Sequence, residues 1–583
     1  MRIRTIVLFV LSGALAVAGT AQTKSATADA EAMYRHGVAA LQRRDLAAAR
    51  IDFEKAAKLS PRSPEAQNSL GWVLFSQGEV DGAISHFRTA LKLRTDFVQA
   101  HINLSNALAR EGNLDEALAE AREAVRIAPS DSEAHRTLGR VLSFRGDLPG
   151  ALAELQRAVA LEPKRSDLHD ELGVVLEQNS RSAEAIGEFT EALRLQPDLA
   201  SANLHLGVLR WQQKSLDEAA QLLRNAVNLS PSNSAAHYYL ALVLEGQGHS
   251  EDALGEVQAA VKLQPNFAEA QNRLGLMLQH SGDGPGAIVA FQKVVELQPT
   301  SADAHNNLGL ALLQTGRAAD AVPEFREAVK AVPQDSSYQE NLAIAYLQMA
   351  DFDSAVSQLR LALQLAPQDA TLHYNLGLAL KLKDQIPEAI PEFEKAAALD
   401  PAQADIHYTL GVTLWQQGDF ARSADELQSA IKIKPDYAEA HYTLGTVLKQ
   451  LGKLPEAASQ LREAIRLQPD FAGAHTTLAA VLRQLGDADG AARESKAGEL
   501  ISQEKTSLQA ATFATNSGQR MLTAGDLDGA ISQFRSAIAR SPEYAPAHFH
   551  LAEALRQKGE QAESQREFQK AAELDPRLKP ASR

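Results

Sequence analysis

Apolar residues recur along this chain at helical spacing, and that pattern itself repeats every 34 residues from residue 30 onward. Within each repeat, positions 4, 7, 8 and 11 share one face of a helix, and positions 20, 24 and 27 share a face of a second helix. Leucine occupies position 7 in fourteen repeats, and alanine occupies positions 20 and 27 in fourteen repeats each. The pattern therefore predicts two amphipathic helices per repeat, packed on each other.

Glycine and proline mark where these helices end. Position 15 is glycine in eleven repeats, as expected where a helix ends in a left-handed residue. Asp or Asn often follows and can cap the second helix. Fourteen of the 23 prolines stand at position 32, for example Pro129 and Pro401, where they stop the second helix. Pro323 and Pro391 stand at position 22, and we expect them to perturb the start of their helices.

The 34-residue period accounts for nearly the whole chain. Sixteen repeats start at residues 30, 64, 98, 132, 166, 200, 234, 268, 302, 336, 370, 404, 438, 472, 511 and 545. We predict an array of fourteen repeats over 30–497, an irregular or helical insertion at 498–510, and a pair of repeats over 511–578. The register shifts by five residues at the insertion, so residues 495–513 are predicted to be the weakest interface.

The first 21 residues have the order of a secretory signal peptide. Arg2 and Arg4 precede an apolar run at 6–17, and small residues follow at 18–21. Cleavage after Ala21 or Ala18 is expected, and the alternative is a retained N-terminal anchor. We therefore predict an exported chain, periplasmic or secreted, with no membrane insertion after cleavage.

Composition narrows the chemistry. The 583 residues include no cysteine, which excludes disulfides, cysteine zinc sites and a thiol nucleophile. A net charge of −15 argues against general nucleic-acid binding. The sequence has no phosphate loop, nucleophile elbow or HExxH motif, and the segments outside the repeats are too short to bury a catalytic domain. We expect no enzymatic activity, no metal and no cofactor.

Ten of the sixteen histidines fall at position 4 of their repeats: His101, His135, His169, His237, His305, His373, His407, His441, His475 and His548. Such a row suggests metal binding, but equivalent positions in stacked helices lie roughly 8–10 Å apart. Two nitrogens bound to one zinc ion lie at most about 4 Å apart. The row is therefore predicted to have a structural role.

These repeats resemble the tetratricopeptide repeat family, in which Leu-Gly, Ala, an aromatic residue, Ala and Pro follow the same period. The resemblance implies an all-α fold, an α-solenoid that winds as a right-handed superhelix of about sixteen helix-turn-helix repeats. It also implies a concave groove lined by the first helices, with positions 2, 5, 9, 12 and 13 facing it. Protein or peptide partners bind in this groove in the family.

Amide and aromatic side chains gather near those positions and are the candidate partner-binding residues. Amides can hydrogen-bond an extended backbone, and Tyr and Trp supply rigid anchors. The alternative is a solvated polar face on an array that binds elsewhere. The run from His305 to Gly309 resembles the asparagine-lined repeats of O-linked N-acetylglucosamine transferases. The candidates are Tyr238, Asn306, Asn307, Asn341, Tyr374, Asn375, Tyr408, Tyr442, Trp211 and Trp415.

Position 2 is acidic in eight repeats, which favours either basic ligands or the ordinary placement of acids in a first helical turn. No repeat has Lys at position 2 or 5, where the chaperone-tail clamp of some family members needs it. The function expected is a non-enzymatic scaffold for protein partners of unknown identity. The alternative is a recognition subunit of a separate envelope enzyme, such as a glycosyltransferase.

Overall fold

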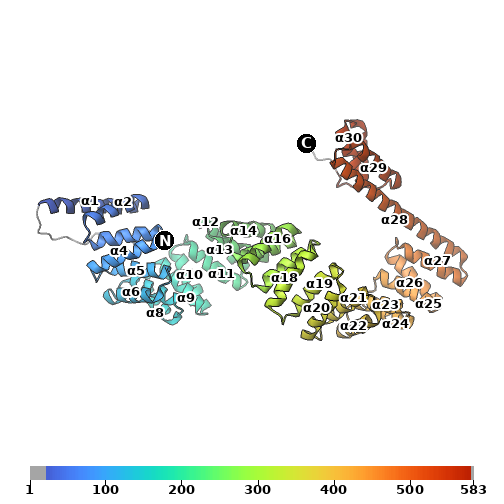
Figure 1. Ribbon diagram of the computed structural model, residues 1–583, viewed down its shortest axis with the longest axis horizontal. Helices are drawn as coiled ribbons and strands as arrows, with labels where there is room; N and C mark the ends of the chain where they lie inside the picture. The colour runs from blue at the N-terminus through green and yellow to red at the C-terminus, as the bar shows by residue number, and fades with distance from the viewer. Residues whose placement is uncertain (1–20, 579–583) are drawn as a thin grey trace. The chain divides into compact units, whose positions relative to one another are not determined.

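The computed structural model of the chain describes residues 21–578. The predicted signal peptide, apart from Ala21, lies outside these described residues. Every regular element within 21–578 is an α-helix, which confirms the all-α class. Figure 1 shows the helices arranged as consecutive antiparallel pairs. The chain divides into a first unit that ends at Leu297 and a second unit that begins at Gln298.

The first unit contains repeats 1 to 8. Its helices are α1 Ala21–Gln42, α2 Leu46–Leu59, α3 Pro64–Ser76, α4 Val80–Leu93, α5 Val98–Arg110, α6 Leu114–Ile127, α7 Ser132–Phe144, α8 Leu148–Leu161, α9 Ser166–Gln178, α10 Ser182–Leu195, α11 Ala200–Gln212, α12 Leu216–Leu229, α13 Ser234–Gly246, α14 Ser250–Leu263, α15 Ala268–His280 and α16 Gly284–Leu297.

The second unit contains repeats 9 to 16. Its helices are α17 Ala302–Gln314, α18 Ala318–Ala331, α19 Ser336–Gln348, α20 Phe352–Leu365, α21 Ala370–Leu382, α22 Ile386–Leu399, α23 Ala404–Gln417, α24 Phe420–Ile433, α25 Ala438–Gln450, α26 Leu454–Leu467, α27 Ala472–Leu485, α28 Ala488–Thr523, α29 Leu527–Arg540, α30 Ala545–Lys558 and α31 Gln561–Leu574.

The two helices of a repeat approach closely because a small residue at position 8 faces a large one at position 24. In repeat 9, a Cβ atom added to Gly309 would lie 2.6 Å from Cε1 of Phe325, and the Phe325 ring is fully buried. Gly71 faces Phe87 in the same way, and Gly139 faces Leu155. The glycines of the sequence pattern therefore admit the rings that form the core.

Two expectations about helix ends have different outcomes. All sixteen residues at position 15 have a positive φ, including five that are not glycine, so the left-handed cap is confirmed. The side chain of Asp351 at position 16 accepts a hydrogen bond from the backbone N–H of Ser354 at the start of α20. The expectation for Pro323 and Pro391 is wrong, because α18 and α22 begin and end at the same repeat positions as the other second helices.

The five non-glycine caps provide a test of backbone strain. Ala350 has a φ of +57°, a conformation that is unfavourable by about 1–2 kcal/mol for a residue with a Cβ atom. Ala350→Gly should therefore stabilise repeat 10 by about 1 kcal/mol. Gly316→Ala, at a φ of +75° with open space around it, should destabilise repeat 9 by a similar amount. Hydrogen exchange of the amides in α19 and α17 measures both; an unchanged exchange rate in both variants would contradict the prediction.

Residues 498–510 lie inside one continuous helix. The 36-residue α28 serves as the second helix of repeat 14 and then as the first helix of repeat 15, and Figure 1 shows it between α27 and α29. Its first part packs on α27 and its last part on α29. No side chain from 499 to 510 is buried. Between repeats 14 and 15, the turn that separates consecutive repeats elsewhere is therefore replaced by a helical segment without buried side chains.

Candidate functional site

The first helices form the inner face of each unit. Within the first unit, α5 contacts α7 directly, and within the second unit, α23 contacts α25 and α25 contacts α27. Contacts between second helices of consecutive repeats are sparser throughout residues 21–578. Stacked pairs that converge on one side must curve toward that side, so the first helices line the concave face, where the sequence places the candidate residues.

The ten histidines at position 4 bridge consecutive repeats. In each, Nδ1 lies 2.5–2.7 Å from a side-chain oxygen at position 23, on the second helix of its own repeat, and Nε2 lies 2.9–3.3 Å from the backbone carbonyl at position 32 of the preceding repeat. The position-23 partners are Glu120, Glu154, Glu188, Glu256, Glu324, Glu392, Glu426, Gln460, Glu494 and Glu567. Each ring therefore faces two acceptors and ties three segments together.

Amide side chains make the same bond to the carbonyl where histidine is absent. Asn203 Nδ2 donates to the carbonyl of Pro197 and Gln271 Nε2 donates to that of Pro265, both at 3.0 Å. Among residues 21–578, no group of three or more His, Asp or Glu residues is placed to hold a metal ion. The geometry of the histidines is thus that of a structural clamp.

One clamp is expected to make stability depend on pH. Burial lowers the pKa of His101, but the hydrogen bonds to Glu120 and to the Thr95 carbonyl, together with the charge of Glu123, outweigh burial, so the pKa lies above its usual value. A raised pKa in the folded state contributes stability below the unfolded pKa of about 6.5, and this contribution is lost as the pH rises through the folded value.

We therefore expect repeat 3 to be more stable at pH 5.5 than at pH 8.5. His101→Gln keeps a donor for the Thr95 carbonyl, as Gln271 shows for its own carbonyl, and should remove this difference. Hydrogen exchange of α5 and α6 at the two pH values measures it. An equal pH dependence in the variant and the original chain would refute a role for His101.

A ladder of side-chain hydrogen bonds runs along the concave face. The residue at position 5 of one repeat bonds to the residue at position 6 of the next, 35 residues later. Asn103 Nδ2 donates to Asn68 Oδ1 at 3.0 Å in the first unit, and Asn341 Nδ2 donates to Asn306 Oδ1 at 2.8 Å in the second. The amides at these positions thus hold consecutive repeats in register.

The ladder includes further candidate residues of the second unit. Asn375 Nδ2 donates to Glu340 Oε1 at 2.8 Å, and the Tyr374 hydroxyl lies 3.2 Å from Thr409 Oγ1. Asn307, at position 6 of repeat 9, is half-buried on the same face. Asn341 and Asn375 each use one donor hydrogen in these bonds, and an amide has two donor hydrogens and an acceptor oxygen. Partner binding by these residues stays a prediction.

The candidate aromatic residues are half-buried, and most of them pack against another ring. The ring centroids of Tyr238 and Phe267 lie 5.0 Å apart in the first unit, where Trp211 packs on Tyr239 at 5.8 Å. In the second unit, Tyr408 packs on Tyr437 at 4.9 Å and Tyr442 on Phe471 at 4.7 Å; Trp415 borders the core of repeats 12 to 14. Such pairs hold aromatic edges in fixed positions on the concave face.

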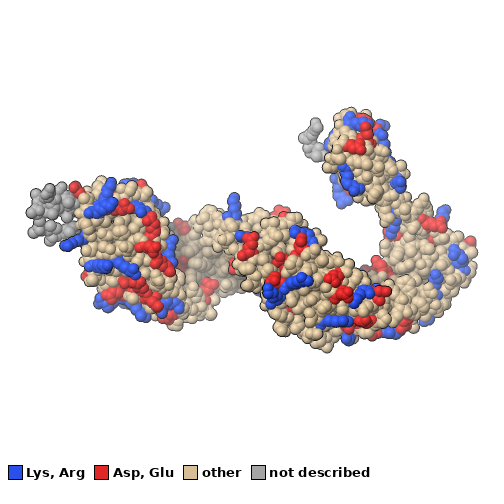
Figure 2. All heavy atoms as spheres, in the orientation of Figure 1, with Lys and Arg blue, Asp and Glu red and all other residues tan. Residues whose placement is uncertain are grey.

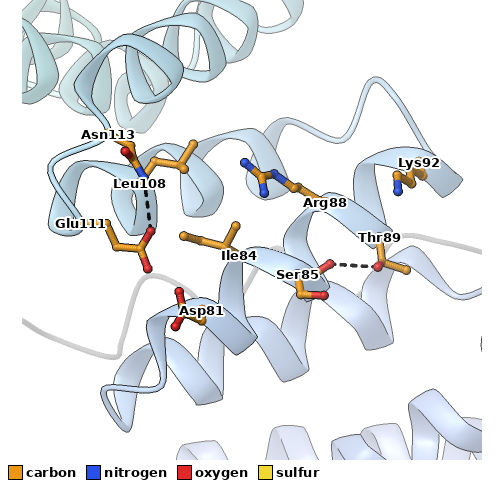
Figure 3. Close-up of a pocket in the computed structure, with 9 residues that line it drawn as sticks. All are labelled: Asp81, Ile84, Ser85, Arg88, Thr89, Lys92, Leu108, Glu111 and Asn113. Atoms are coloured by element: carbon orange, nitrogen blue, oxygen red, sulfur yellow. Dashed lines mark hydrogen bonds between the residues drawn. The ribbon is translucent and has the colours of Figure 1, made fainter.

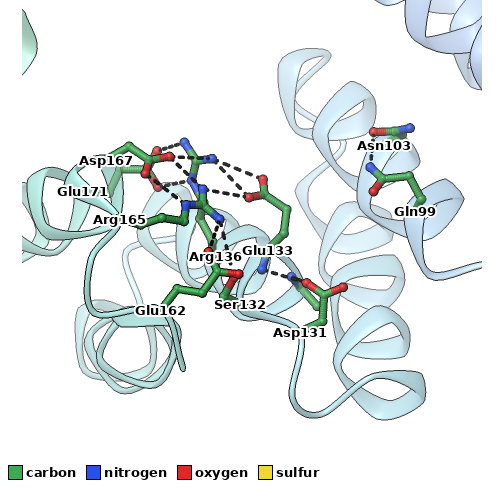
Figure 4. A network of polar contacts seen from close by, with 11 residues as sticks. Gln99, Asn103, Asp131, Ser132, Glu133, Arg136, Glu162, Arg165, Asp167 and Glu171 are labelled. Atoms are coloured by element: carbon green, nitrogen blue, oxygen red, sulfur yellow. Dashed lines mark hydrogen bonds and ion pairs between the residues drawn. The ribbon is translucent and has the colours of Figure 1, made fainter. Parts of the chain in front are cut away.

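The acids at position 2 are largely engaged within the chain. Figure 4 shows Glu133 and Asp167 in a network with Arg136 and Arg165. Arg136 Nε donates to Glu171 Oε2 at 2.9 Å, and Arg165 Nη2 lies 2.7 Å from Asp167 Oδ2. Burial raises the pKa of Asp167, but the Arg165 hydrogen bond and the two guanidinium charges outweigh burial and hold that pKa below its usual range.

The same holds in the second unit, where the hydroxyls of Tyr338 and Tyr437 donate to Asp303 and Asp405 at 2.6 and 2.8 Å. These contacts argue against a free negative stripe. Figure 2 accordingly shows positive and negative side chains intermixed on the visible face of each unit.

The sequence interpretation missed a row of apolar side chains at position 9. The row comprises Val174, Val208, Leu242 and Leu276 in the first unit and Leu310, Ile344, Leu378 and Val412 in the second. Only Leu242 is fully buried, and the others are half-buried or exposed. The sequence contained a signal for this row. The core of each repeat needs apolar residues at positions 4, 7, 8 and 11 but not at position 9, so a run of apolar residues at position 9 points to a role outside the core.

Two hollows lie between second helices and the repeats that follow them. Figure 3 shows one, of about 300 Å³, where Asp81 of α4 and Glu111 after α5 face each other. The neighbouring carboxyl group of Asp81 raises the pKa of Glu111. The other, of about 440 Å³, lies near Arg224 and Glu256. Both are at the small end of the range for ligand pockets, which are about 300–1,000 Å³.

Family profiles match most of the chain. Profiles described as Tetratricopeptide repeat match residues 13–66, 34–96, 68–132, 136–200, 178–234, 281–336 and 341–384, and also 210–275 and 521–581. A profile described as TPR repeat matches 382–418, 414–452 and 445–486. The chain therefore belongs to the tetratricopeptide repeat family, a class whose members generally act as protein-interaction scaffolds.

No curated protein matches the chain by sequence. Among solved structures, the chain is similar to the APC/C hetero-tetramer Cut9–Hcn1, at 16% identity over 92% of this chain and 99% of that chain, with a TM-score of 0.35. It is also similar to yeast Tom70, at 17% identity over 73% of this chain and 97% of that chain, with a TM-score of 0.33, and to PilF of Pseudomonas aeruginosa, at 22% identity over 36% and 94%, with a TM-score of 0.32. These similarities concern the fold alone.

Proposed function

We propose that this chain is a non-enzymatic scaffold that holds protein or peptide partners on the concave face of its repeats. The row of apolar side chains at position 9 carries the proposal. Leu310, Ile344 and Leu378 are each half-buried on the face made by the first helices. Equivalent positions of consecutive repeats lie roughly 8–10 Å apart, so these side chains form a continuous band instead of scattered contacts, as is typical of interaction surfaces.

The rest of this face supports the same function. The ladder between positions 5 and 6 fixes the spacing of the repeats, and the aromatic pairs fix the edges of the rings. A surface ordered before binding loses less conformational entropy when a partner docks. The apolar band supplies contact area, and the amides beside it supply hydrogen bonds.

Site-specific photo-crosslinking in cells tests this function. A photoreactive residue placed at Leu378 or at Tyr408 should capture a reproducible partner, whereas the same residue at Lys432, exposed on α24, should not. With the purified partner, Leu378→Asp should weaken binding at least tenfold, or about 1.4 kcal/mol. Capture only from Lys432, or turnover of a substrate by the pure chain that survives Leu378→Asp, would contradict a scaffold that binds through its concave face.

We also propose that the chain is exported, either to the periplasm or out of the cell. The order of charged, apolar and small residues over 1–21 supports this. No helix within residues 21–578 is long and apolar enough to span a membrane. N-terminal sequencing of the protein recovered from the cell envelope or medium should begin at Gln22 or Gly19. An intact Met1 in the cytoplasmic fraction would refute export.

A further inference from the structure

Within the array over 30–497, position 12 carries basic residues only in the last four repeats; in the pair that follows, repeat 15 has Leu522 and repeat 16 has Arg556 at this position. Its occupants in repeats 11 to 14 are Lys381, Trp415, Lys449 and Arg483, on the last turns of α21, α23, α25 and α27. Repeats 2 to 10 have neither Lys nor Arg at this position; their residues are Phe75, Ala109, Ser143, Glu177, Trp211, Glu245, Gln279, Leu313 and Leu347. The three cations therefore belong to one local stretch of the concave face, the position-12 row.

The cations of the position-12 row lack counter-charges, as do Lys432 and Arg462 on the second helices, whereas several other cations of these repeats are paired. Within residues 21–578, no carboxylate forms an ion pair with any of the three. By contrast, Lys383 lies 2.6 Å from Asp353, and Arg466 lies 2.6 Å from Glu463. Lys381 is half-buried, and this burial lowers its pKa. A half-buried ammonium group without a partner is unfavourable, and a ligand that supplies a carboxylate would remove this penalty.

The acids on the same face stand apart from the row. Asp405 and Glu439 are at position 2 of repeats 12 and 13, ten residues before position 12, which is about 15 Å along a helix. The Tyr437 hydroxyl already donates to Asp405 at 2.8 Å. The immediate neighbours of the row are instead apolar or amide residues, such as Leu382, which is 57% exposed, and Gln450.

The spacing of the row fits one backbone conformation. Stacked first helices place equivalent side chains roughly 8–10 Å apart. A polyproline II segment rises about 3.1 Å per residue with three residues per turn, so every third side chain points the same way at intervals of about 9.3 Å. A β-strand repeats its side-chain direction about every 6.7 Å, which does not match. An extended ligand can therefore present one side chain to each repeat.

We propose that repeats 11 to 14 bind an extended acidic segment of a protein partner. Its carboxylates lie opposite Lys381, Lys449 and Arg483, and an aromatic or large apolar side chain lies against Trp415. The segment reads acid-x-x-aromatic-x-x-acid-x-x-acid in one direction along the stack. This inference rests on the proposed scaffold function and specifies the chemistry of the partner.

Synthetic peptides test the inference on the full mature chain. A labelled peptide with Glu at the three acidic places and Trp at the aromatic place should bind in a fluorescence anisotropy titration, in one of its two sequence directions. The same peptide with Gln in place of each Glu should bind at least tenfold more weakly. The affinity of the Glu peptide should fall as salt is added, because its carboxylates are screened.

Variants locate the binding. Lys381→Glu, Lys449→Glu and Arg483→Glu together should weaken the Glu peptide at least tenfold, and the corresponding triple change to Gln should weaken it in the same direction. The matched control is Lys432→Glu with Arg462→Glu, two exposed cations of α24 and α26, which should leave the affinity within about twofold. Circular dichroism of each variant should match that of the original chain.

Several results would overturn the inference. They are equal binding of the Glu and Gln peptides, equal loss in the control variant, or tighter binding of a single-stranded RNA of equal charge that the triple variant abolishes. If the partner crosslinked from Leu378 is captured equally well by the triple variant, the scaffold function stands and the acidic specificity fails. If no partner is crosslinked from any concave position, the scaffold function itself fails.

Discussion

Replacing Gly309 by alanine should destabilise repeat 9 by about 1–3 kcal/mol, although alanine is the better helix former. The new Cβ atom would lie 2.6 Å from Cε1 of Phe325, and that ring is fully buried, so the two helices would have to move apart or the ring would have to shift. The same substitution at Gly187, an exposed helical position with open space around it, should instead stabilise its repeat by about 0.5–1 kcal/mol. Opposite signs for Gly309→Ala and Gly187→Ala would show that close contact between the two helices, and not the helix propensity of alanine, decides the change in stability at Gly309.

The chain itself provides the compensating pair. Repeat 10 has Ala343 at position 8 and Leu359 at position 24, and both are fully buried. Gly309→Ala combined with Phe325→Leu should therefore recover most of the stability lost by Gly309→Ala alone. Because an array of repeats unfolds in stages, hydrogen exchange of α17 and α18 is the appropriate measurement. Additive effects of the two substitutions would show that these residues do not limit the approach of the helices.

Local signals explain why the helices could be predicted so fully. Glycine at position 15 and Asp at position 16 act through their own backbone neighbourhood, as the Asp351 cap on α20 shows, and so they can be read one repeat at a time. The structural role of His305 could also be predicted from spacing. Its partner Glu324, 19 residues later, was not identified, although Glu occurs at position 23 only in repeats with His at position 4.

The concave face was harder to predict because its contacts join different repeats. The bond between Asn306 and Asn341 spans one period plus one residue, so neither residue indicates its partner within its own repeat. The acids at position 2 presented two alternatives, and the contacts of Asp167 with Arg136 and Arg165 favour internal pairing. The isolated cations of the position-12 row became visible only once the other ion pairs were known.

The segment 495–513 shows where the sequence alone left two outcomes open, an irregular insertion or a helical one. A five-residue register shift predicts an interruption, yet no glycine or proline stands between Gly498 and Gly518, so nothing stops the helix. Phe513 shows the consequence. It stands at position 3, and the side chain at this position is buried in repeats 2 to 14 and 16. Phe513 is instead 72% exposed. The reason is that the second helix of repeat 14 runs on into the first helix of repeat 15 as α28, so it does not fold back to cover position 3.

Limited trypsin digestion should cut first within the exposed part of α28, between Lys496 and Arg520. Helical segments with few tertiary contacts open at a lower free energy than packed ones, and the side chain of Lys505 is 53% exposed although it pairs with Asp470. Thr506→Pro should speed this cleavage about a hundredfold, since proline inside a helix costs about 3 kcal/mol or more and cleavage follows the open population.

Thr506→Ala is the matched control, because it removes the hydroxyl that donates to the Ser502 carbonyl and keeps the backbone N–H. It should leave the cleavage rate within about twofold. The two fragments should each retain the helical circular dichroism of their repeats, since the middle of α28 buries no side chain from either stack. Initial cuts spread evenly over the loops of all repeats, or loss of helicity in the larger fragment, would show that α28 couples the stacks and is not their weakest interface.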